Sequence, residues 1–167
     1  TLEGCPAMIH GGPFANIAHG CNSLMATKTA MQYGDYVVTE AGFASDLGAE
    51  KFFNIKCRKA GLNPAMSVLV ATSQALKLSG GIAEDKMKLP DMVALAKGLQ
   101  NMEKHIGILK SFDQKVLVVL NRHHFDSAEE IAFMKNWCND KQVVFAVNDG
   151  YSKGGDGAVE MAQAVVD

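Results

Sequence analysis

The 167-residue sequence has no excess of basic residues, because 16 lysines and arginines stand against 18 aspartates and glutamates, a formal net charge of −2. A balance of this kind argues against nucleic acid or an anionic membrane as the main partner. No apolar run reaches the length of about 20 residues that a membrane-spanning helix needs, and the first residues lack the layout of a secretion signal. We therefore expect a cytoplasmic protein that acts on small molecules.

Cysteines are few, and none of them forms a CxxC pair. Cys5, Cys21, Cys57 and Cys138 lie far apart among apolar or helical residues, which predicts buried, reduced thiols rather than a disulfide framework. A catalytic thiol at Cys21 is the alternative because His19 is near in sequence, although residues two apart on a helix do not face each other.

A phosphate-binding loop of the form GxxxxGK[ST] is also missing. The nearest substitute is the segment 9–23, IHGGPFANIAHGCNS, in which Gly11 and Gly12 allow a sharp turn and a close backbone approach before a predicted helix. Asn16 adds a hydrogen-bonding side chain to this segment. It is interpreted as a ligand-binding loop, and a plain strand-to-helix turn is the alternative.

Short apolar runs alternate with helical patterns along the chain. The expected strands are residues 36–39, 66–71, 116–120 and 143–147, with 7–9 as a further candidate. The expected helices are residues 15–33, 46–60, 90–111, 128–139 and 158–166. This alternation predicts one α/β segment over 1–167 with three layers, a mostly parallel sheet covered by helices on both faces. Residues 78–89, LSGGIAEDKMKL, have no steady period and are a candidate lid or insertion.

Polar residues follow four of the expected strands, at 7–9, 36–39, 116–120 and 143–147. We expect these four strand ends to converge on one face, because open parallel sheets bind ligands beyond the carboxyl ends of their strands. Glu40 follows the run 36–39, NRHH follows the run 116–120, and NDG follows the run 143–147. A carboxylate such as Glu40 at the end of a buried strand can hold Mg²⁺ or orient a phosphate. A helix cap or a lysine pair is the alternative role for this residue.

Rings and one cation are concentrated in two of these loops. His123 and His124 can stack on a flat ligand or hydrogen-bond to it, whereas adjacent histidines rarely hold a metal ion without a third ligand at a recognisable spacing. Tyr151 lies in the glycine-rich segment 150–157, where it can stack on a ligand or simply pin the loop, and Lys153 offers a cation there. An ordinary polar loop is the alternative in both places.

Together these motifs resemble the formate–tetrahydrofolate ligase family. The resemblance is carried by LEGCPAMIHGGPFANIAHGCNS at 2–23, DYVVTEAGFASDLGAEKFFNIKCR at 35–58, GLQNMEKHI at 98–106, VVLNRH at 118–123 and SKGGDGA at 152–158. The first two motifs are long and specific. The resemblance covers essentially the whole chain, which is under a third of the usual length in the family.

The resemblance implies an ATP-dependent ligase that activates formate as formyl phosphate and passes the formyl group to N10 of tetrahydrofolate. It implies Mg²⁺, a monovalent cation (K⁺ or NH₄⁺), a homotetramer and a fold related to the P-loop NTPases. It also implies that the phosphate loop, and an arginine that grips formyl phosphate, belong to a part of the ligase upstream of this segment. The fragment alone is therefore expected to be inactive, since phosphoryl transfer depends on positioned cations.

The expected site combines the strand-end residues with the resemblance. We expect a catalytic role for Glu40, substrate contacts from Phe14, Asn16, His123, His124 and Tyr151, and nucleotide contacts from Gly11, Gly12, Lys153, Gly154 and Gly155. The sequence departs from the family where His123 and His124 replace an aromatic–proline pair and where Tyr151 replaces a common tryptophan. Stacking through His123 and Tyr151 is expected with altered geometry, because imidazole is smaller than phenyl and can acquire charge.

Two other functions remain open from the sequence. One is a non-catalytic module that binds nucleotide or folate, and a GKTTT-type phosphate loop upstream would argue against it. The other is a subunit-interaction fragment, for which Phe52, Phe53 and Cys57 on an exposed apolar face would be the sign.

Overall fold

The computed structural model describes residues 1–9 and 21–167. The described residues form two compact units, Thr1–Pro64 (the first unit) and Ala65–Asp167 (the second unit). In the second unit three parallel strands pair in the order β1 (Ser67–Ala71), β2 (Val116–Asn121) and β3 (Val144–Asn148). The central strand β2 is buried along its first five residues, as expected for a strand that is covered on both faces.

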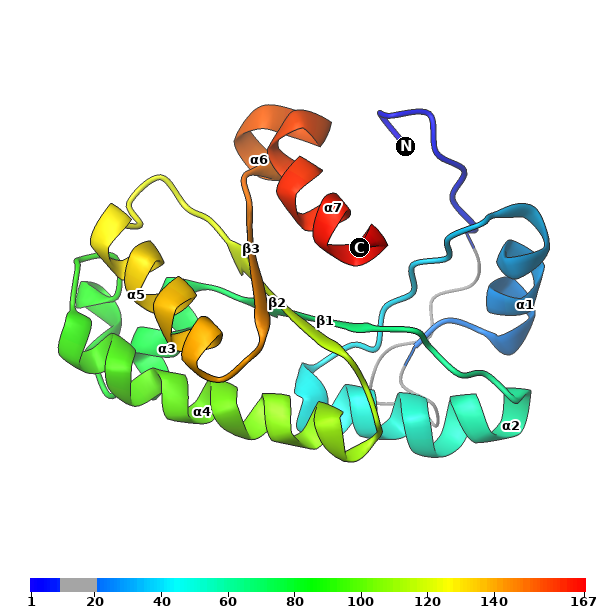
Figure 1. Ribbon diagram of the computed structural model, residues 1–167, viewed down its shortest axis with the longest axis horizontal. Coiled ribbons are helices and arrows are strands. Elements are labelled where there is room, and N and C mark those ends of the chain that lie inside the picture. The colour runs from blue at the N-terminus through cyan, green and yellow to red at the C-terminus, as the bar shows by residue number, and fades with distance from the viewer. Residues whose placement is uncertain (10–20) are drawn as a thin grey trace. The chain divides into compact units, whose positions relative to one another are not determined.

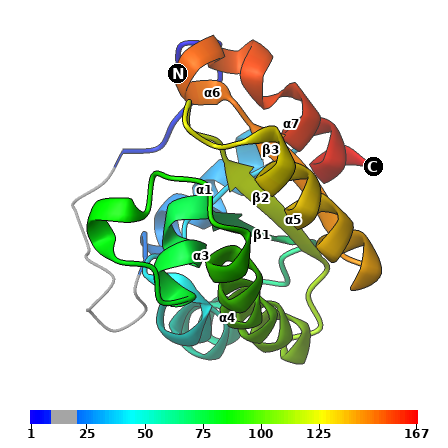
Figure 2. The ribbon, with the colours of Figure 1, turned by 90° about the vertical axis from the view of Figure 1, so that its left-hand side faces the viewer.

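Helices cover both faces of this sheet (Figures 1 and 2). On one face, α7 (Val159–Val166) packs on β2 and β3, where Leu117 and Ala146 lie in one apolar cluster with Met161. On the other face, α4 (Met92–Ser111) contacts β1 and β2, and α5 (Ala128–Asp140) contacts β3. The three-layer α/β fold with a parallel sheet is confirmed.

Shorter elements connect these layers. In the second unit they are α3 (Ser73–Ser79), the 3₁₀ turns η3 (Glu84–Lys86) and η4 (Gly154–Ala158), and α6 (Gly150–Lys153). Helix starts follow sequence signals: Asp91 caps α4, and Ser127 forms a capping box with Glu130 at the start of α5. The capping box fixes where α5 begins, directly after the loop that leaves β2.

The described first unit is helical. It contains α1 (Leu24–Tyr33), capped by Ser23, and then a continuous run of wide π-helical turns, η1 (Ala44–Ala49) and η2 (Phe52–Cys57), that ends in α2 (Arg58–Ala60). The strands expected at 7–9 and 36–39 are wrong. Neither segment pairs with a strand in the described part of the chain, and Ile9 and Val38 are 95% and 92% exposed. A strand needs a neighbour to take its backbone N–H and C=O groups, and apolar residues alone do not supply one.

The thiols are mostly inside, as predicted, and none of the four forms a disulfide. Cys21 and Cys57 belong to an apolar cluster of the first unit together with Phe52, whereas Cys5 is exposed and departs from the prediction. Burial raises the pKa of the Cys138 thiol to about 11. Phe52 and Cys57 are each only 6% exposed, so the exposed apolar face that would mark a subunit-interaction fragment does not form at these two residues.

Two glycines of α4 provide a matched test of helix packing. A Cβ at Gly98 would lie 1.8 Å from the carbonyl oxygen of Leu76 in α3, whereas a Cβ at Gly107 would meet nothing within 4 Å. We expect Gly98→Ala to lower the free energy of unfolding by about 1–3 kcal/mol, because α3 and α4 must separate. Gly107→Ala is expected to raise it by about 0.5–1 kcal/mol, because alanine restricts the unfolded chain more than glycine does. Urea unfolding of the two variants checks both signs, and equal effects would contradict the close α3–α4 approach.

Candidate functional site

The carboxyl ends of β2 and β3 meet through their polar side chains. The Asn148 amide donates to Asn121 Oδ1 at 3.1 Å, and the Arg122 backbone N–H donates to the Asn148 carbonyl at 3.0 Å. The Arg122 guanidinium also forms an ion pair with Asp149 at 2.9 Å. Two of the four predicted strand ends therefore converge at one edge of the sheet, whereas the strands expected at 7–9 and 36–39 do not form.

The glycine-rich loop after β3 is built on Asp149. Lys153 Nζ lies 3.0 Å from the Asp149 carboxylate, and the hydrogen bond from Lys153, together with the charge of Arg122, lowers the pKa of Asp149. Gly154 follows with a left-handed φ of 61°, a conformation that favours glycine. Tyr151, predicted to contact substrate, is fully exposed, and the Lys153 side chain is 61% exposed. Both side chains are open to a ligand.

A cluster of rings, His123, His124 and Phe125, lies in the loop that leaves β2. The His123 and Phe125 rings stack with centroids 5.1 Å apart and an interplanar angle of 11°, and His124 meets Phe125 edge-on at 5.0 Å. Lys88 Nζ lies 6.0 Å from the centroid of the Phe125 ring. Phe125 and Lys88 were not predicted from the sequence, although an aromatic residue directly after two histidines was an available signal for Phe125.

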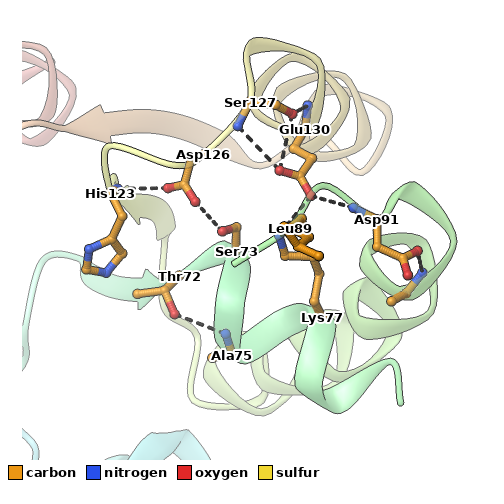
Figure 3. Close-up of polar contacts among 11 residues, drawn as sticks. Thr72, Ser73, Ala75, Lys77, Leu89, Asp91, His123, Asp126, Ser127 and Glu130 are labelled. Atoms are coloured by element: carbon orange, nitrogen blue, oxygen red, sulfur yellow. Dashed lines mark hydrogen bonds and ion pairs between the residues drawn. The ribbon is translucent and has the colours of Figure 1, made fainter. Parts of the chain in front are cut away.

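Buried Asp126 anchors the loop of the ring cluster through hydrogen bonds. Its carboxylate accepts a hydrogen bond from the His123 backbone N–H at 2.8 Å and another from the Ser73 hydroxyl at the start of α3 (Figure 3). Asp126 is 7% exposed and Ser73 is 1% exposed. The loop after β2 is thereby joined to α3, although the two lie about fifty residues apart in sequence.

A buried ion pair lies beside this contact. Lys77 Nζ is 3.0 Å from Glu130 Oε1, and both side chains are at most 1% exposed. Lys77 also donates to the Leu89 carbonyl at 2.8 Å, and Glu130 accepts from the Asp91 N–H at 3.1 Å (Figure 3). Burial would raise the pKa of Glu130, but hydrogen bonds from Lys77, Asp91 and Ser127 outweigh it and hold the pKa below its ordinary value. The pair thus fixes the backbone on either side of Pro90.

In the first unit, Glu40 is exposed and directly follows Thr39, whose side chain is anchored by a hydrogen bond. The Thr39 hydroxyl donates to Asn22 Oδ1 at 3.0 Å, and the same oxygen accepts from Lys56. Lys56 is 1% exposed, and burial lowers the pKa of its ammonium group. Glu40 is therefore held by its neighbours while its own carboxylate is open to solvent.

Three consecutive residues after Ala41 have left-handed backbone. The φ angles are 52° at Gly42, 42° at Phe43 and 40° at Ala44, and the latter two are uncommon for residues with a Cβ. A Cβ at Gly48 would lie 1.3 Å from the Gly42 carbonyl oxygen, so the backbone of η1 packs directly on this turn. Such strain persists only where the surrounding structure enforces it, and it is common at functional sites.

Several predicted residues are not brought together by the structure. Gly11, Gly12, Phe14 and Asn16 lie outside the described residues. Across residues 1–9 and 21–167, no group of three or more histidine, cysteine, aspartate or glutamate side chains is placed to hold a metal ion. No helix in the same ranges is long and apolar enough to cross a membrane.

The second unit also has a hollow of about 690 Å³, which lies at the opposite end of the strands from the ring cluster. Its lining includes the residues at which β2 and β3 begin and the residue before each strand, together with one residue of α7: Lys115, Val116, Val143, Val144 and Gln163. Because ligands of open parallel sheets bind at the carboxyl ends of the strands, we place the candidate site at the ring cluster and not in this hollow.

Known proteins match this chain over its whole length. The family model described as formate–tetrahydrofolate ligase matches residues 1–167. The chain is 56% identical over all its residues to the formate–tetrahydrofolate ligase of Bacteroides thetaiotaomicron and 57% identical to that of Parabacteroides distasonis. The Porphyromonas gingivalis ligase is 54% identical over the same 167 residues. The chain spans 30% of the length of each of these relatives.

Proposed function

We propose that this chain, which belongs to the formate–tetrahydrofolate ligase family, supplies one wall of the folate and nucleotide cleft of an ATP-dependent ligase. The ligase would form 10-formyltetrahydrofolate from formate and tetrahydrofolate by way of formyl phosphate. The observation that carries the proposal is the identity of 56–57% over the entire chain to ligases of that name.

The ring cluster and Tyr151 suit the flat pterin of tetrahydrofolate. His124 and Tyr151 are exposed, and His124 adjoins the stack of His123 on Phe125. Aromatic faces bind flat heterocycles through offset stacking and apolar burial. Phe14 and Asn16 belong to the same proposal, from the loop outside the described residues. These side chains would orient the pterin so that N10 meets the activated formyl group.

The loop after β3 suits the nucleotide. Lys153 offers an exposed ammonium group, which its ion pair with Asp149 holds beside the loop. Gly154 and Gly155 have no side chains and so allow a ligand to approach the backbone closely. ATP would supply the phosphoryl group that activates formate. Gly11 and Gly12 are proposed as further nucleotide contacts.

Glu40 fits Mg²⁺ as a single carboxylate ligand. Mg²⁺ keeps several waters and phosphate oxygens and needs only one or two protein carboxylates, so an exposed glutamate that follows the hydrogen-bonded Thr39 is a suitable donor. When bound, Mg²⁺ would neutralise charge on the phosphates. A monovalent cation, K⁺ or NH₄⁺, and a homotetramer of the whole ligase belong to the same proposal without assigned residues.

An assay of 10-formyltetrahydrofolate formation tests this function on two proteins. The full-length ligase that contains this chain is expected to turn over only with ATP, formate and tetrahydrofolate together. The 167-residue chain alone is expected to give no product, and titration calorimetry with tetrahydrofolate and with ATP measures what it retains of the cleft. Absence of activity in the full-length protein would favour the non-catalytic binding module, and turnover by the chain alone would contradict the partial site.

A further inference from the structure

Lys88 is a cation beside the ring cluster that the proposed function leaves without a role. It is exposed, it lies in the segment between η3 and α4, and its Nζ is 6.0 Å from the centroid of the Phe125 ring. At this distance an ammonium group is attracted to an aromatic face. The contact places a positive charge over the Phe125 ring, within the ring cluster.

The backbone that carries Lys88 is anchored by buried groups. The carbonyl of the next residue, Leu89, accepts a hydrogen bond from Lys77 at 2.8 Å, and the Leu89 N–H donates to the Lys86 carbonyl at 2.8 Å. Two residues further on, the Asp91 N–H donates to Glu130 (Figure 3). The position of Lys88 is therefore set by an ion pair that is shielded from water.

The same ion pair also helps to hold the loop that carries the ring cluster. Glu130 stands in the first turn of α5 and completes the capping box with Ser127, two residues after Phe125. Asp126, between them, holds the His123 backbone N–H (Figure 3). One hydrogen-bonded network thus holds the backbone next to Lys88 and the loop that carries the rings. Such preorganisation lowers the entropic cost of binding a ligand that has a planar part and an anionic part.

We propose that Lys88 binds a carboxylate of the glutamate tail of tetrahydrofolate while the ring cluster holds the flat part of the same molecule. The inference rests on the proposed function. Tetrahydrofolate combines a flat pterin with a tail that ends in carboxylates, and one ammonium beside a ring surface matches that combination. The nucleotide phosphates have another cation, Lys153, on the loop after β3.

Kinetics of the full-length ligase with two substrates test this role. The variant is Lys88→Gln, and the control is Lys86→Gln, an exposed lysine two residues earlier at the end of η3. The substrates are tetrahydrofolate and its diamide, in which both glutamate carboxylates are carboxamides. We expect Lys88→Gln to raise the KM for tetrahydrofolate about three- to fivefold, as for an exposed ion pair, with kcat and the KM values for ATP and formate unchanged. With the diamide, wild type and Lys88→Gln are expected to be equal. Lys88→Arg, which keeps the charge, should restore most of the affinity for tetrahydrofolate.

Three results would overturn the inference. One is an equal loss with tetrahydrofolate and with the diamide, another is a raised KM for ATP in place of tetrahydrofolate, and the third is the same effect from Lys86→Gln. A wild-type ligase that forms no 10-formyltetrahydrofolate would overturn the proposed function itself. An active wild type with an unchanged Lys88→Gln variant overturns only the role of Lys88.

Discussion

The variant Glu130→Ala is expected to lower the free energy of unfolding of the chain by about 3–5 kcal/mol. Without the carboxylate, the Lys77 ammonium stays buried with 0% of its side chain exposed, and its hydrogen bond to the neutral Leu89 carbonyl does not compensate its charge. The Asp91 N–H loses its acceptor and α5 loses its capping box at the same time. Urea unfolding of the 167-residue chain, followed by far-ultraviolet circular dichroism, measures the loss.

Two further variants separate the ion pair from a general effect of substitution. Glu129→Ala changes the exposed neighbour in the same helical turn and should shift the free energy of unfolding by no more than about 0.5 kcal/mol. The double variant Lys77→Met with Glu130→Leu should recover the part of the loss that comes from the uncompensated ammonium, because apolar residues often replace a buried ion pair without net cost. The part that comes from the Asp91 N–H and the capping box should remain. A Glu130→Ala variant within about 1 kcal/mol of wild type would contradict a buried pair.

The same pair gives the sign of a pH dependence. Hydrogen bonds hold the pKa of Glu130 lower in the folded chain than in the unfolded chain. The stabilisation is therefore complete above the unfolded pKa, near 4.3, and is lost as the pH falls through the folded pKa. The difference in unfolding free energy between wild type and Glu130→Ala should accordingly be constant at neutral pH and shrink on acidification.

The strands of the second unit could be predicted because their signal is local. The runs 66–71 and 116–120 differ from β1 and β2 by one residue at one end, and the run 143–147 is displaced from β3 by one residue. Val118 and Leu120 are buried with their neighbours, so a short, wholly apolar run bounded by polar residues was sufficient evidence. The run 36–39 has the same local signal but no partner strand among the described residues, and periodicity cannot supply that partner.

The site was predictable only in part, for the same reason. Polar residues after β2 and β3 followed from the rule that ligands bind at the carboxyl ends of strands, and Asn121 and Asn148 do meet there. The contacts of Lys77 with Glu130 and of Lys88 with Phe125 join residues from separate elements, so their local sequence carries no sign of them. Of this network only the Ser127–Glu130 capping box could be seen in the sequence.

Glu40→Gln in the full-length ligase is the substitution with the largest expected effect on activity. We expect kcat to fall by about 10²- to 10³-fold, the cost of removing one charged group that stabilises a transition state. The amide keeps the size of the side chain but loses the charge that would face Mg²⁺ or a phosphate. The variant should keep the stability of wild type within about 0.5 kcal/mol, because the Glu40 side chain is exposed.

Controls on Glu40 distinguish a role in the reaction from a role in the fold. Glu50→Gln removes another exposed carboxylate from the first unit and should leave kcat unchanged. Asn22→Ala, by contrast, removes the acceptor that anchors Thr39, so it should lower both stability and activity while the carboxylate itself remains. If Glu40 holds Mg²⁺, the Mg²⁺ concentration for half-maximal activity should rise in Glu40→Gln and not in Glu50→Gln. Unchanged kcat and unchanged Mg²⁺ dependence would remove Glu40 from the mechanism, and the strained turn at Gly42–Ala44 would then serve the fold alone.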